Sequence, residues 1–327
     1  MTTPKLLSVI LFQLILLHSI LYCTNAQSLQ DGFYQKSCPS MEGIVKKITA
    51  QYISKAPSLA APLLRMHFHD CFIRGCDGSI LLDSTTKHKS EKEANPNIGM
   101  RGFQVIDAAK SAVEKQCPGV VSCADILALV ARDAVYAING PFWPVPMGRR
   151  DGRVSIQSEA DNQLPSPNAD IYQLISLFSS KGLNARDLAV LSGGHTIGIS
   201  HCGPFTNRLY NNSGKGDTDP TMDQTYISRL KVKCKPGDST TIVEMDPGSA
   251  KTFDNDYYTL VSQRRGLFKS DSALLNDDVT KKYVNRQVAS GGSTFFADFK
   301  ESMVKMGQIG VLTGSAGEIR KTCGFVN

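Results

Sequence analysis

The residues best suited to chemistry lie in the segment 63–79, which reads LLRMHFHDCFIRGCDGS. Arg65 and His69 are four residues apart, so in a helix their side chains share one face about one turn apart. A guanidinium and an imidazole that converge on one point suit general acid–base catalysis on a small, polarisable bond. The sequence therefore predicts a catalytic pair at Arg65 and His69.

Oxygen-bearing side chains follow this pair along the chain. Asp70, Asp77 and Ser79 are hard donors of the kind that Ca²⁺ prefers. Cys71 and Cys76 bracket the turn between them, where a local disulfide could form. The same short segment therefore predicts a metal-binding loop directly behind the catalytic pair.

A second cluster surrounds His195 in the segment 188–198, LAVLSGGHTIG. The two glycines before His195 allow the backbone to approach another group closely. A lone histidine is more often structural than a ligand, so the spacing alone leaves both interpretations open. Downstream, Asp271 stands among apolar residues, and a buried carboxylate there could accept the second N–H of a ligating imidazole.

The segment 246–254 carries regularly spaced oxygen donors, at Asp246, Ser249, Thr252 and Asp254. Together with Thr196 these oxygens could close around a second Ca²⁺. The alternative is a polar surface loop with helix caps, and the residues by themselves favour that alternative.

Residues 1–26 have the pattern of a secretory signal peptide. Lys5 is the only charged residue, 6–17 is mostly apolar, and a small residue, Ala26, ends the segment. A membrane anchor is the alternative, but the apolar run is short for a span and no basic residues follow it. We therefore expect secretion, with a mature chain of residues 27–327.

Composition narrows the function classes. Removal of Lys5 leaves 35 basic against 30 acidic residues, a net charge of +5 without any Lys/Arg block. This argues against nucleic acid as a partner and allows weak attraction to an acidic cell-wall polysaccharide. No heptad pattern or long apolar stripe requires a partner helix, so we expect a monomer.

Cysteine usage agrees with secretion. Cys23 lies in the signal segment, and eight of the nine cysteines remain: Cys38, Cys71, Cys76, Cys117, Cys123, Cys202, Cys234 and Cys323. An even number in a secreted chain predicts four disulfides, but eight cysteines allow 105 pairings. No CxxC pair occurs, which argues against a zinc ribbon or a thioredoxin-like site.

Helical periodicity dominates the rest of the chain, and strand-like alternation is scarce, so the predicted class is mainly α. We expect helices over 40–54, 58–71, 103–117, 122–138 and 170–181. Ser122 is a predicted N-cap, Gly182 a predicted C-cap, and Asn184 the predicted cap of a further short helix.

Several motifs in order resemble the secretory plant haem peroxidases (class III, of the horseradish type). They are RMHFHDCF, GCDGSILLD, EKEANPN, RGFQVID, VSCADILALVARD, PMGRRDG, LSGGHTIG, FDNDYY and SD. The match runs over 27–327 with the eight cysteines in register. The resemblance implies two helical halves enclosing one haem b, four disulfides, two Ca²⁺ and minimal β structure. It also implies reduction of H₂O₂ to water, with oxidation of phenolic donors in two one-electron steps via a ferryl intermediate.

The resemblance also implies roles for the residues of both clusters. His195 would bind the haem iron, and Asp271 would accept its Nδ1–H. His69 would take a proton from H₂O₂ and return it to the departing oxygen, while Arg65 would stabilise the charge that develops. Asn97 would fix the tautomer of His69.

Two further positions concern access to the haem. By the same resemblance, Phe68 would pack over the haem edge, and Pro165 would line the substrate entrance. Asn211, in the sequon Asn211-Asn212-Ser213, is the predicted glycosylation site of a secreted chain. The loop 97–101 is about one residue shorter than in the horseradish pattern, and the natural phenolic donor stays open.

The metal ligands and disulfides that the resemblance implies form three sets. The distal Ca²⁺ would be bound by Asp70, Asp77, Ser79 and the carbonyls of Ile73 and Gly75, with Glu91 reached through water. The proximal Ca²⁺ would be bound by Thr196, Asp246, Ser249, Asp254 and the carbonyl of Thr252. The disulfides would be Cys38–Cys117, Cys71–Cys76, Cys123–Cys323 and Cys202–Cys234.

Two other classes of function remain to be weighed. A zinc hydrolase would use His67, His69 and Asp70, but histidines two apart point to different helix faces. A non-catalytic, Ca²⁺-dependent wall-binding protein would be expected to lose Arg65, His69 or His195, and this chain keeps all three. We therefore expect a secreted peroxidase of the apoplast or cell wall, with no membrane association after signal cleavage.

Overall fold

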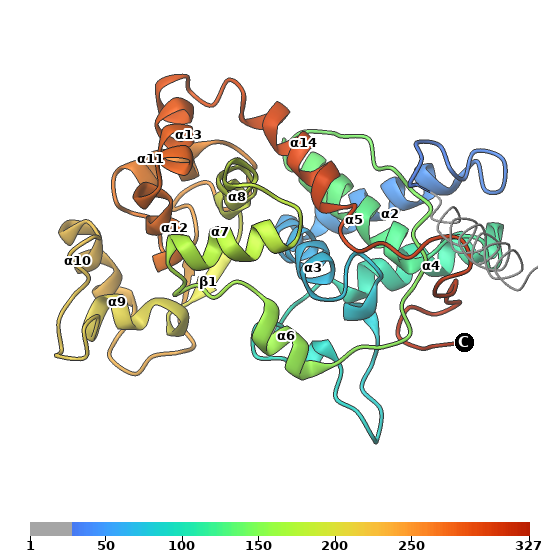
Figure 1. The fold of residues 1–327 in the computed structure, drawn as a ribbon, viewed down its shortest axis with the longest axis horizontal. Coiled ribbons are helices and arrows are strands. Elements are labelled where there is room, and N and C mark those ends of the chain that lie inside the picture. Colours follow the sequence, from blue (N-terminus) through green and yellow to red (C-terminus); the bar gives the residue numbers. More distant parts are fainter. Residues whose placement is uncertain (1–27) are drawn as a thin grey trace, which may run out of the picture.

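The computed structural model describes residues 28–327, so the expected signal peptide at 1–26 lies outside the described residues. The helices form two groups (Figure 1). The first group contains α2 (Met41–Lys55), α3 (Ala60–Ile73), α4 (Phe103–Gln116), α5 (Cys123–Tyr136) and α6 (Gln157–Gln163). The second contains α7 (Ile171–Ser180), α8 (Ala185–Ser192), α9 (Thr206–Tyr210), α10 (Gln224–Lys233), α11 (Asp256–Ser262), α12 (Lys269–Ala273) and α13 (Asp278–Ala289). The last helix, α14 (Phe295–Met306), lies between the groups and packs against α8.

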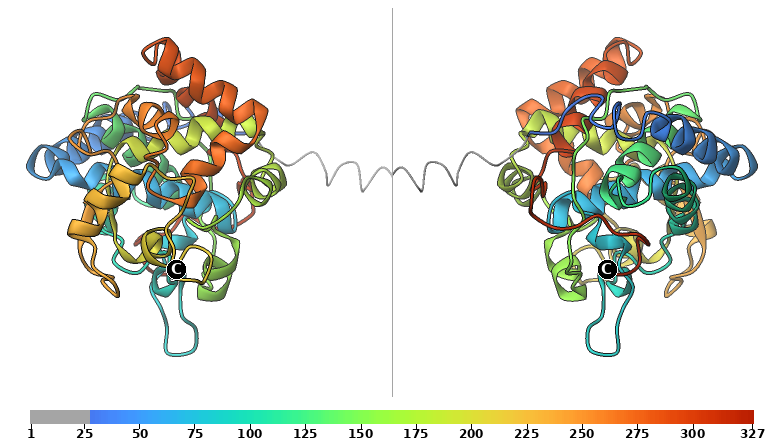
Figure 2. Two further views of the ribbon diagram at one scale, coloured as in Figure 1. Left: turned by 90° about the vertical axis from the view of Figure 1, so that its left-hand side faces the viewer. Right: turned by 90° about the vertical axis from the view of Figure 1, so that its right-hand side faces the viewer.

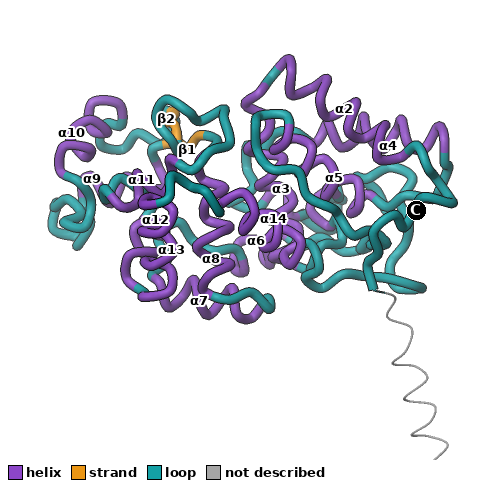
Figure 3. Tube along the Cα trace, turned by 90° about the horizontal axis from the view of Figure 1, so that it is seen from above, coloured by secondary structure: helices purple, strands orange, loops and turns teal. Residues whose placement is uncertain are grey.

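Helices dominate the described chain, as Figure 3 shows, which confirms the mainly α prediction. One two-stranded antiparallel sheet pairs β1 (Ile199–His201) with β2 (Ile242–Glu244). Short 3₁₀ turns connect the helices, and two matter below: η3 (Glu91–Glu93) and η4 (Gly193–Thr196). The loop between η2 (Ser79–Leu81) and η3 projects away from the helices (Figure 2). No helix within residues 28–327 combines the length and apolar character needed to cross a membrane.

Both predicted N-caps are present, whereas the C-cap of α7 is Lys181, one residue before the predicted Gly182. Ser122 Oγ accepts a hydrogen bond from the backbone N–H of Asp125 at 3.1 Å, which starts α5. Asn184 caps α8 in a reciprocal capping box with Asp187. One predicted start was early, because the turn at Pro57 forms a separate 3₁₀ helix before α3 begins.

A single main core runs through both groups of helices. It includes Met41 of α2, Leu63 of α3, Val130 of α5, Tyr258 of α11 and Phe299 of α14, all at most 1% exposed. Because every group contributes to it, α3 and the segment after α8 are held in fixed positions relative to each other.

A smaller satellite core lies beside the main one, around α9, α10 and β2. Its buried members are Cys202, Phe205, Leu209, Met222, Tyr226, Ile227, Leu230, Cys234, Val243, Met245 and Leu267. Arg208, fully buried, joins this unit to the segment before α12. Its Nη1 donates to the carbonyls of Gly266, Leu267 and Phe268 at 2.8–2.9 Å, and its Nε donates to Asp219 at 2.8 Å.

Four disulfides cross-link the fold, and they are the pairs that the resemblance implied: Cys38–Cys117, Cys71–Cys76, Cys123–Cys323 and Cys202–Cys234. The third joins the first turn of α5 to the C-terminal segment across 200 residues. Asp151, fully buried, reinforces this junction by accepting backbone hydrogen bonds from Cys123, Ala124 and Arg320 at 2.9–3.1 Å. A carboxylate at the start of a helix is favoured by the helix dipole.

Candidate active site

Helix α3 holds the predicted catalytic pair on one face. Arg65 Nε donates a hydrogen bond to His69 Nε2 at 3.1 Å. Arg65 Nη2 donates to the carbonyl of Pro96 at 2.7 Å, so the guanidinium is anchored at two points. The Phe68 ring meets the His69 ring edge-on, with the centroids 5.3 Å apart. The structure thus brings Arg65, Phe68 and His69 to one place.

Asn97 sets the protonation of the His69 ring. His69 Nδ1 and Asn97 Oδ1 lie 2.5 Å apart, and Asn97 Nδ2 donates to the carbonyl of Glu91 at 2.7 Å. Because the amide nitrogen is used in this way, Asn97 offers its oxygen to His69, which must carry the proton on Nδ1. The Nε2 atom is then a bare acceptor facing Arg65. Burial lowers the pKa of His69 to about 3, the charge of Arg65 adds to this, and the bond to Asn97 opposes it.

His195 is the central residue of the second cluster, and its ring is held by a carboxylate. It lies in η4 directly after α8, and its Nδ1 is 2.8 Å from Asp271 Oδ1. The other oxygen, Asp271 Oδ2, accepts from the backbone N–H of Phe268 at 2.7 Å. Burial alone would raise the pKa of Asp271, but the charge of His195 and the hydrogen bonds to the carboxylate outweigh burial and lower it. Asp271 is therefore ionised and accepts the Nδ1 proton of His195.

The open side of His195 fits an iron ligand. Its side chain is 41% exposed, whereas Asp271 is 2% exposed, and its Nε2 makes no hydrogen bond within residues 28–327. An imidazole held at Nδ1 by a carboxylate presents the basic Nε2 that binds haem iron. Gly198 lets this segment approach α3, because a Cβ on Gly198 would lie 2.8 Å from the Cβ of Ala61. The residues present therefore suit a haem beside η4.

Buried oxygens without partners lie behind His69. Asp70, Asp77, Ser79 and Glu91 are all at most 5% exposed. Ser79 Oγ and both carboxylate oxygens of Glu91 have no hydrogen-bond partner within the described chain. Burial raises the pKa of Asp70, with a further contribution from the charge of Asp77, and burial raises the pKa of Glu91 to about 8. Unpaired oxygens and mutually repelling carboxylates suit a divalent cation such as Ca²⁺.

The carbonyls expected to complete this loop are present beside it. The carbonyl of Gly75 accepts from the backbone N–H of Asp77 at 2.7 Å, and that of Ile73 accepts from Lys181 Nζ at 3.3 Å. Gly75 is required by the packing, since a Cβ there would lie 2.4 Å from the carbonyl oxygen of Gly310. The loop is therefore pressed against the segment that follows α14.

A second group of oxygens lies next to His195. Thr196 Oγ1 donates to Asp254 at 2.7 Å and lies 3.3 Å from Asp246 Oδ2. Ser249 Oγ is a buried atom without a hydrogen-bond partner within the described chain. Burial raises the pKa of Asp246 to about 6, and the charge of Asp254 adds to this shift. Thr252, by contrast, is exposed, and its backbone N–H donates to the Ser249 carbonyl at 2.7 Å.

Sequence reasoning missed two residues at this side of the site. The carboxylates of Asp246, Asp254 and Asp256 offer oxygens within 4.8 Å of one another, which adds Asp256 to the expected set. Tyr257 Oη donates to Asp271 Oδ1 at 3.0 Å. The spacing of Asp256 two residues after Asp254 was a usable signal, whereas Tyr257 has only the pattern of a core aromatic residue.

Two other predicted residues, Pro165 and Asn211, make no hydrogen bond with His69 or His195 within residues 28–327. Pro165 is half-buried in the loop between α6 and α7. Asn211 is exposed directly after α9, and its Oδ1 accepts from the backbone N–H of Gly216 at 3.0 Å.

The zinc alternative finds no support in the geometry. His67 is buried against Cys71, with its Nδ1 3.7 Å from Sγ, and burial lowers its pKa to about 3.

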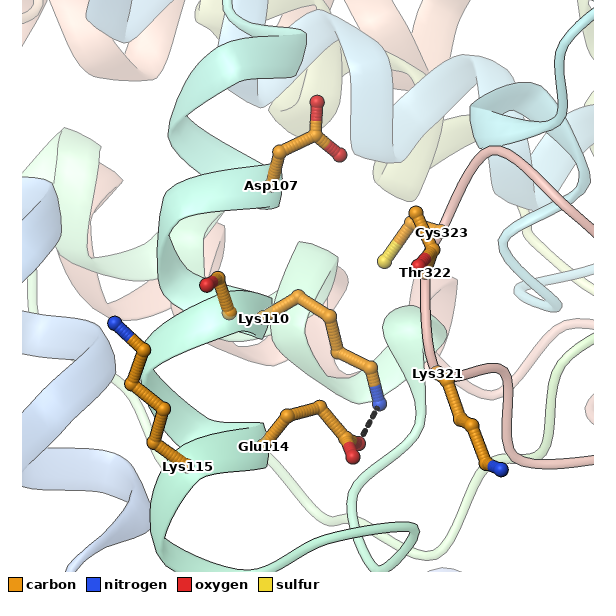
Figure 4. Close-up of a pocket in the computed structure, with 8 residues that line it drawn as sticks. Asp107, Lys110, Glu114, Lys115, Lys321, Thr322 and Cys323 are labelled. Carbon is orange, nitrogen blue, oxygen red and sulfur yellow. Dashed lines mark hydrogen bonds and ion pairs between the residues drawn. The ribbon is translucent and has the colours of Figure 1, made fainter.

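A polar hollow of about 330 Å³ lies elsewhere, between α4 and the C-terminal segment (Figure 4). Its charged groups serve the fold. Lys110 Nζ donates to Glu114 at 2.5 Å and to the carbonyl of Val121 at 2.6 Å. Glu114 in turn accepts from the backbone N–H of Gly119 at 2.8 Å. These bonds fasten the end of α4 to the turn that follows it.

Comparisons with known proteins agree with this geometry. A family model described as "Peroxidase" matches residues 45–290. Peroxidase 27 of Arabidopsis thaliana is 61% identical over 303 residues, which cover 93% of this chain and 94% of that protein. Peroxidase 56 of the same plant is 58% identical, covering 94% and 95%. Peroxidase 1 of Oryza sativa subsp. japonica is 55% identical, covering 97% and 98%. The chain therefore belongs to the plant haem peroxidases of class III, and it is an enzyme that uses H₂O₂ to oxidise donor substrates.

Proposed function

We propose that His69 and Arg65 carry out the acid–base part of peroxide reduction, and that His195 would hold the haem iron. The observation that supports this most strongly is the unprotonated Nε2 of His69, which accepts a hydrogen bond from Arg65 Nε at 3.1 Å. Haem, when bound, supplies the redox-active iron at which the peroxide is reduced. The protein's own residues supply proton transfer, charge stabilisation and exclusion of other reactants.

The proton moves between the two oxygens of the peroxide through His69. Nε2 accepts a proton from the attacking oxygen, because Nδ1 is already protonated and bonded to Asn97. The same atom then returns the proton to the second oxygen, which leaves as water with the electron pair of the O–O bond as that bond breaks. A haem held by His195 would supply the two electrons that peroxide reduction consumes. Arg65 is a fixed cation beside this path and stabilises the negative charge that develops on the departing oxygen. Phe68 packs against His69 and restricts access by larger donors.

His195 and Asp271 form the supporting pair on the other side. The bond from His195 Nδ1 to Asp271 fixes the ring orientation and increases the electron density available at Nε2. This favours the oxidised state of a bound metal, which peroxide reduction requires. Reducing substrates then return the enzyme to rest in two one-electron steps. We infer that these substrates are small phenols that enter past Pro165.

We further propose two bound Ca²⁺. The distal ion would take oxygens from Asp70, Ile73, Gly75, Asp77 and Ser79, with Glu91 linked through water. The proximal ion would take oxygens from Thr196, Asp246, Ser249, Thr252 and Asp254. The unpartnered Ser79, Glu91 and Ser249 oxygens support this assignment. Each ion would bind the residue that directly follows one of the two histidines, because Asp70 follows His69 and Thr196 follows His195. Each ion would therefore help to hold that histidine in place.

We also propose that residues 27–327 form one secreted peroxidase domain of the apoplast or cell wall, released from the signal peptide 1–26. The apolar pattern of 1–26 and the four disulfides support secretion. Asn211 would carry a glycan, since it is exposed in its loop. The mature protein would be a monomer with weak attraction to acidic wall polysaccharide and none to nucleic acid.

One experiment tests the catalytic proposal directly. The absorption spectrum of the purified protein is recorded before and after one equivalent of H₂O₂, and again after addition of guaiacol, a simple phenol. We expect a Soret band that changes with peroxide and recovers with the phenol. A protein folded in Ca²⁺ with haem supplied that shows no Soret band would contradict the proposal.

A further inference from the structure

The carboxylate that supports His195 has a second side-chain donor. Tyr257 Oη lies 3.0 Å from Asp271 Oδ1, the same oxygen that lies 2.8 Å from His195 Nδ1. The Tyr257 ring stands edge-on to the His195 ring, with the centroids 6.0 Å apart. Tyr257 and Asp271 are each 2% exposed. Two donors therefore share one carboxylate oxygen, and both the carboxylate and the phenol are buried away from bulk water.

We propose that Tyr257 is a positioning residue that limits how strongly Asp271 pulls on the Nδ1 proton of His195, and that it thereby sets the reduction potential of the bound haem. This inference rests on the proposed role of His195 as iron ligand. A carboxylate oxygen that accepts two hydrogen bonds carries less charge for each donor than one that accepts a single bond. With Tyr257 in place, His195 keeps more of its proton and acquires less imidazolate character.

The direction of the Tyr257 bond follows from the chemistry of its partner. The ionised Asp271 can only accept, so the phenol must donate. Burial raises the pKa of Tyr257 well above its usual range, and the charge of Asp271 adds to this, so the phenol stays protonated. The backbone N–H of Phe268 occupies the other oxygen at 2.7 Å, which prevents the carboxylate from turning away from Tyr257.

The backbone fixes the positions of Tyr257 and His195 relative to each other. Tyr257 is in the first turn of α11 and directly follows Asp256, while His195 directly precedes Thr196. Thr196 donates to Asp254 at 2.7 Å, so the two segments are joined immediately beside the shared carboxylate. The position of the phenol relative to the imidazole is therefore fixed by the fold.

The neighbouring tyrosine provides a matched control. Tyr258 is also buried in α11, but its Oη donates to the carbonyls of Ala189 and Val190 at 3.1 and 3.3 Å. Tyr257→Phe and Tyr258→Phe therefore each remove one buried hydroxyl from the same helix. Only the first changes the hydrogen bonds of Asp271.

The test uses the haem-loaded protein and does not depend on turnover. We measure the Fe(III)/Fe(II) midpoint potential and the iron–histidine stretching frequency of the ferrous form. Tyr257→Phe should shift the reduction equilibrium about tenfold toward Fe(III), which is about 59 mV more negative, and should raise the stretching frequency. Tyr258→Phe should leave both values at those of the parent protein.

A second variant tests the same inference if Tyr257→Phe fails to fold. Placing 3-fluorotyrosine at position 257 keeps the shape but strengthens the donor, so it should shift the potential in the positive direction. Unchanged values in both position-257 variants, or an equal shift in Tyr258→Phe, would overturn the inference about Tyr257. If the parent protein itself lacks an iron–histidine band, the assignment of His195 as ligand fails instead.

Discussion

Asn97 Oδ1 and His69 Nδ1 lie 2.5 Å apart, and this contact places the ring proton of His69 on Nδ1 and leaves Nε2 unprotonated. The Asn97 side chain has no freedom to reverse, because its Nδ2 donates to the carbonyl of Glu91 at 2.7 Å. The orientation of the His69 ring, the proposed base, is therefore linked through one amide to η3, the turn that carries Glu91, a proposed calcium-linked carboxylate.

Replacing His69 by Ala should slow the reaction with H₂O₂ by roughly 10²–10⁴-fold, the usual contribution of a positioned general base. Haem should remain bound, because the proposed ligand His195 is untouched. Stopped-flow measurement of the Soret change gives the rate. His67→Gln serves as the control, since His67 packs against Cys71 instead of facing Arg65. Reaction of the Ala variant at the parent rate would show that His69 is not the base.

Replacing Asn97 by Val should reduce the same rate by about tenfold. One hydrogen bond to the ring is worth about 1.4 kcal/mol, and its loss allows His69 to adopt the unproductive tautomer for part of the time. The haem spectrum and the rate of reduction by guaiacol should stay close to those of the parent. A variant with an unchanged peroxide rate would show that the tautomer is set by another group.

The peroxide reaction should be nearly independent of pH between about 4 and 7. Burial and the charge of Arg65 lower the pKa of His69 to about 3, so the neutral base persists at acid pH. Protonation of His69 removes the base, so the rate of the peroxide reaction should fall only as the pH drops toward 3. Rapid-mixing experiments over this range measure the profile. A decline centred near the ordinary histidine value of about 6.5 would contradict the predicted shift.

Calcium titration of the chelator-treated protein should give two sites. Asp256→Asn should weaken one of them by about tenfold and leave the other unchanged, because it removes one of three carboxylates that lie within 4.8 Å of one another. Glu91→Gln is the matched change at the other site and should show the opposite selectivity. Isothermal calorimetry resolves the two affinities. A uniform effect of Asp256→Asn on both sites would count against a local role.

Much of the fold could be predicted from local pattern. The starts of α2, α5 and α7 were predicted to within one residue. Ser122 and Asp170 cap their helices there, whereas Ser40 makes no side-chain cap and α2 was found from its apolar spacing. The start of α3 was less accurate, since a 3₁₀ turn at Pro57 follows the same apolar pattern as an α-helix. Pairing of the cysteines was beyond spacing alone and required the family resemblance.

The candidate site divides in the same way. Arg65 and His69 could be paired from an interval of four residues, because a helix fixes their relation locally. Tyr257 and Asp271 are fourteen residues apart and meet only because α11 and α12 fold around His195. In sequence, a buried tyrosine that donates to a carboxylate looks the same as one that merely fills the core. Long-range polar contacts of this kind leave no periodic trace.

The satellite core has a consequence for motion. Its own disulfide, Cys202–Cys234, closes the unit on itself, and none of the other three disulfides reaches it. Arg208 attaches the unit to the carbonyls of Gly266, Leu267 and Phe268, and Phe268 lies three residues before Asp271. We expect this unit to open as a separate foldon, with amide exchange in α9 and α10 faster than in α3. Each such opening would loosen the segment before Asp271. Local unfolding of this unit would therefore change the position of Asp271 and, through it, that of the His195 imidazole.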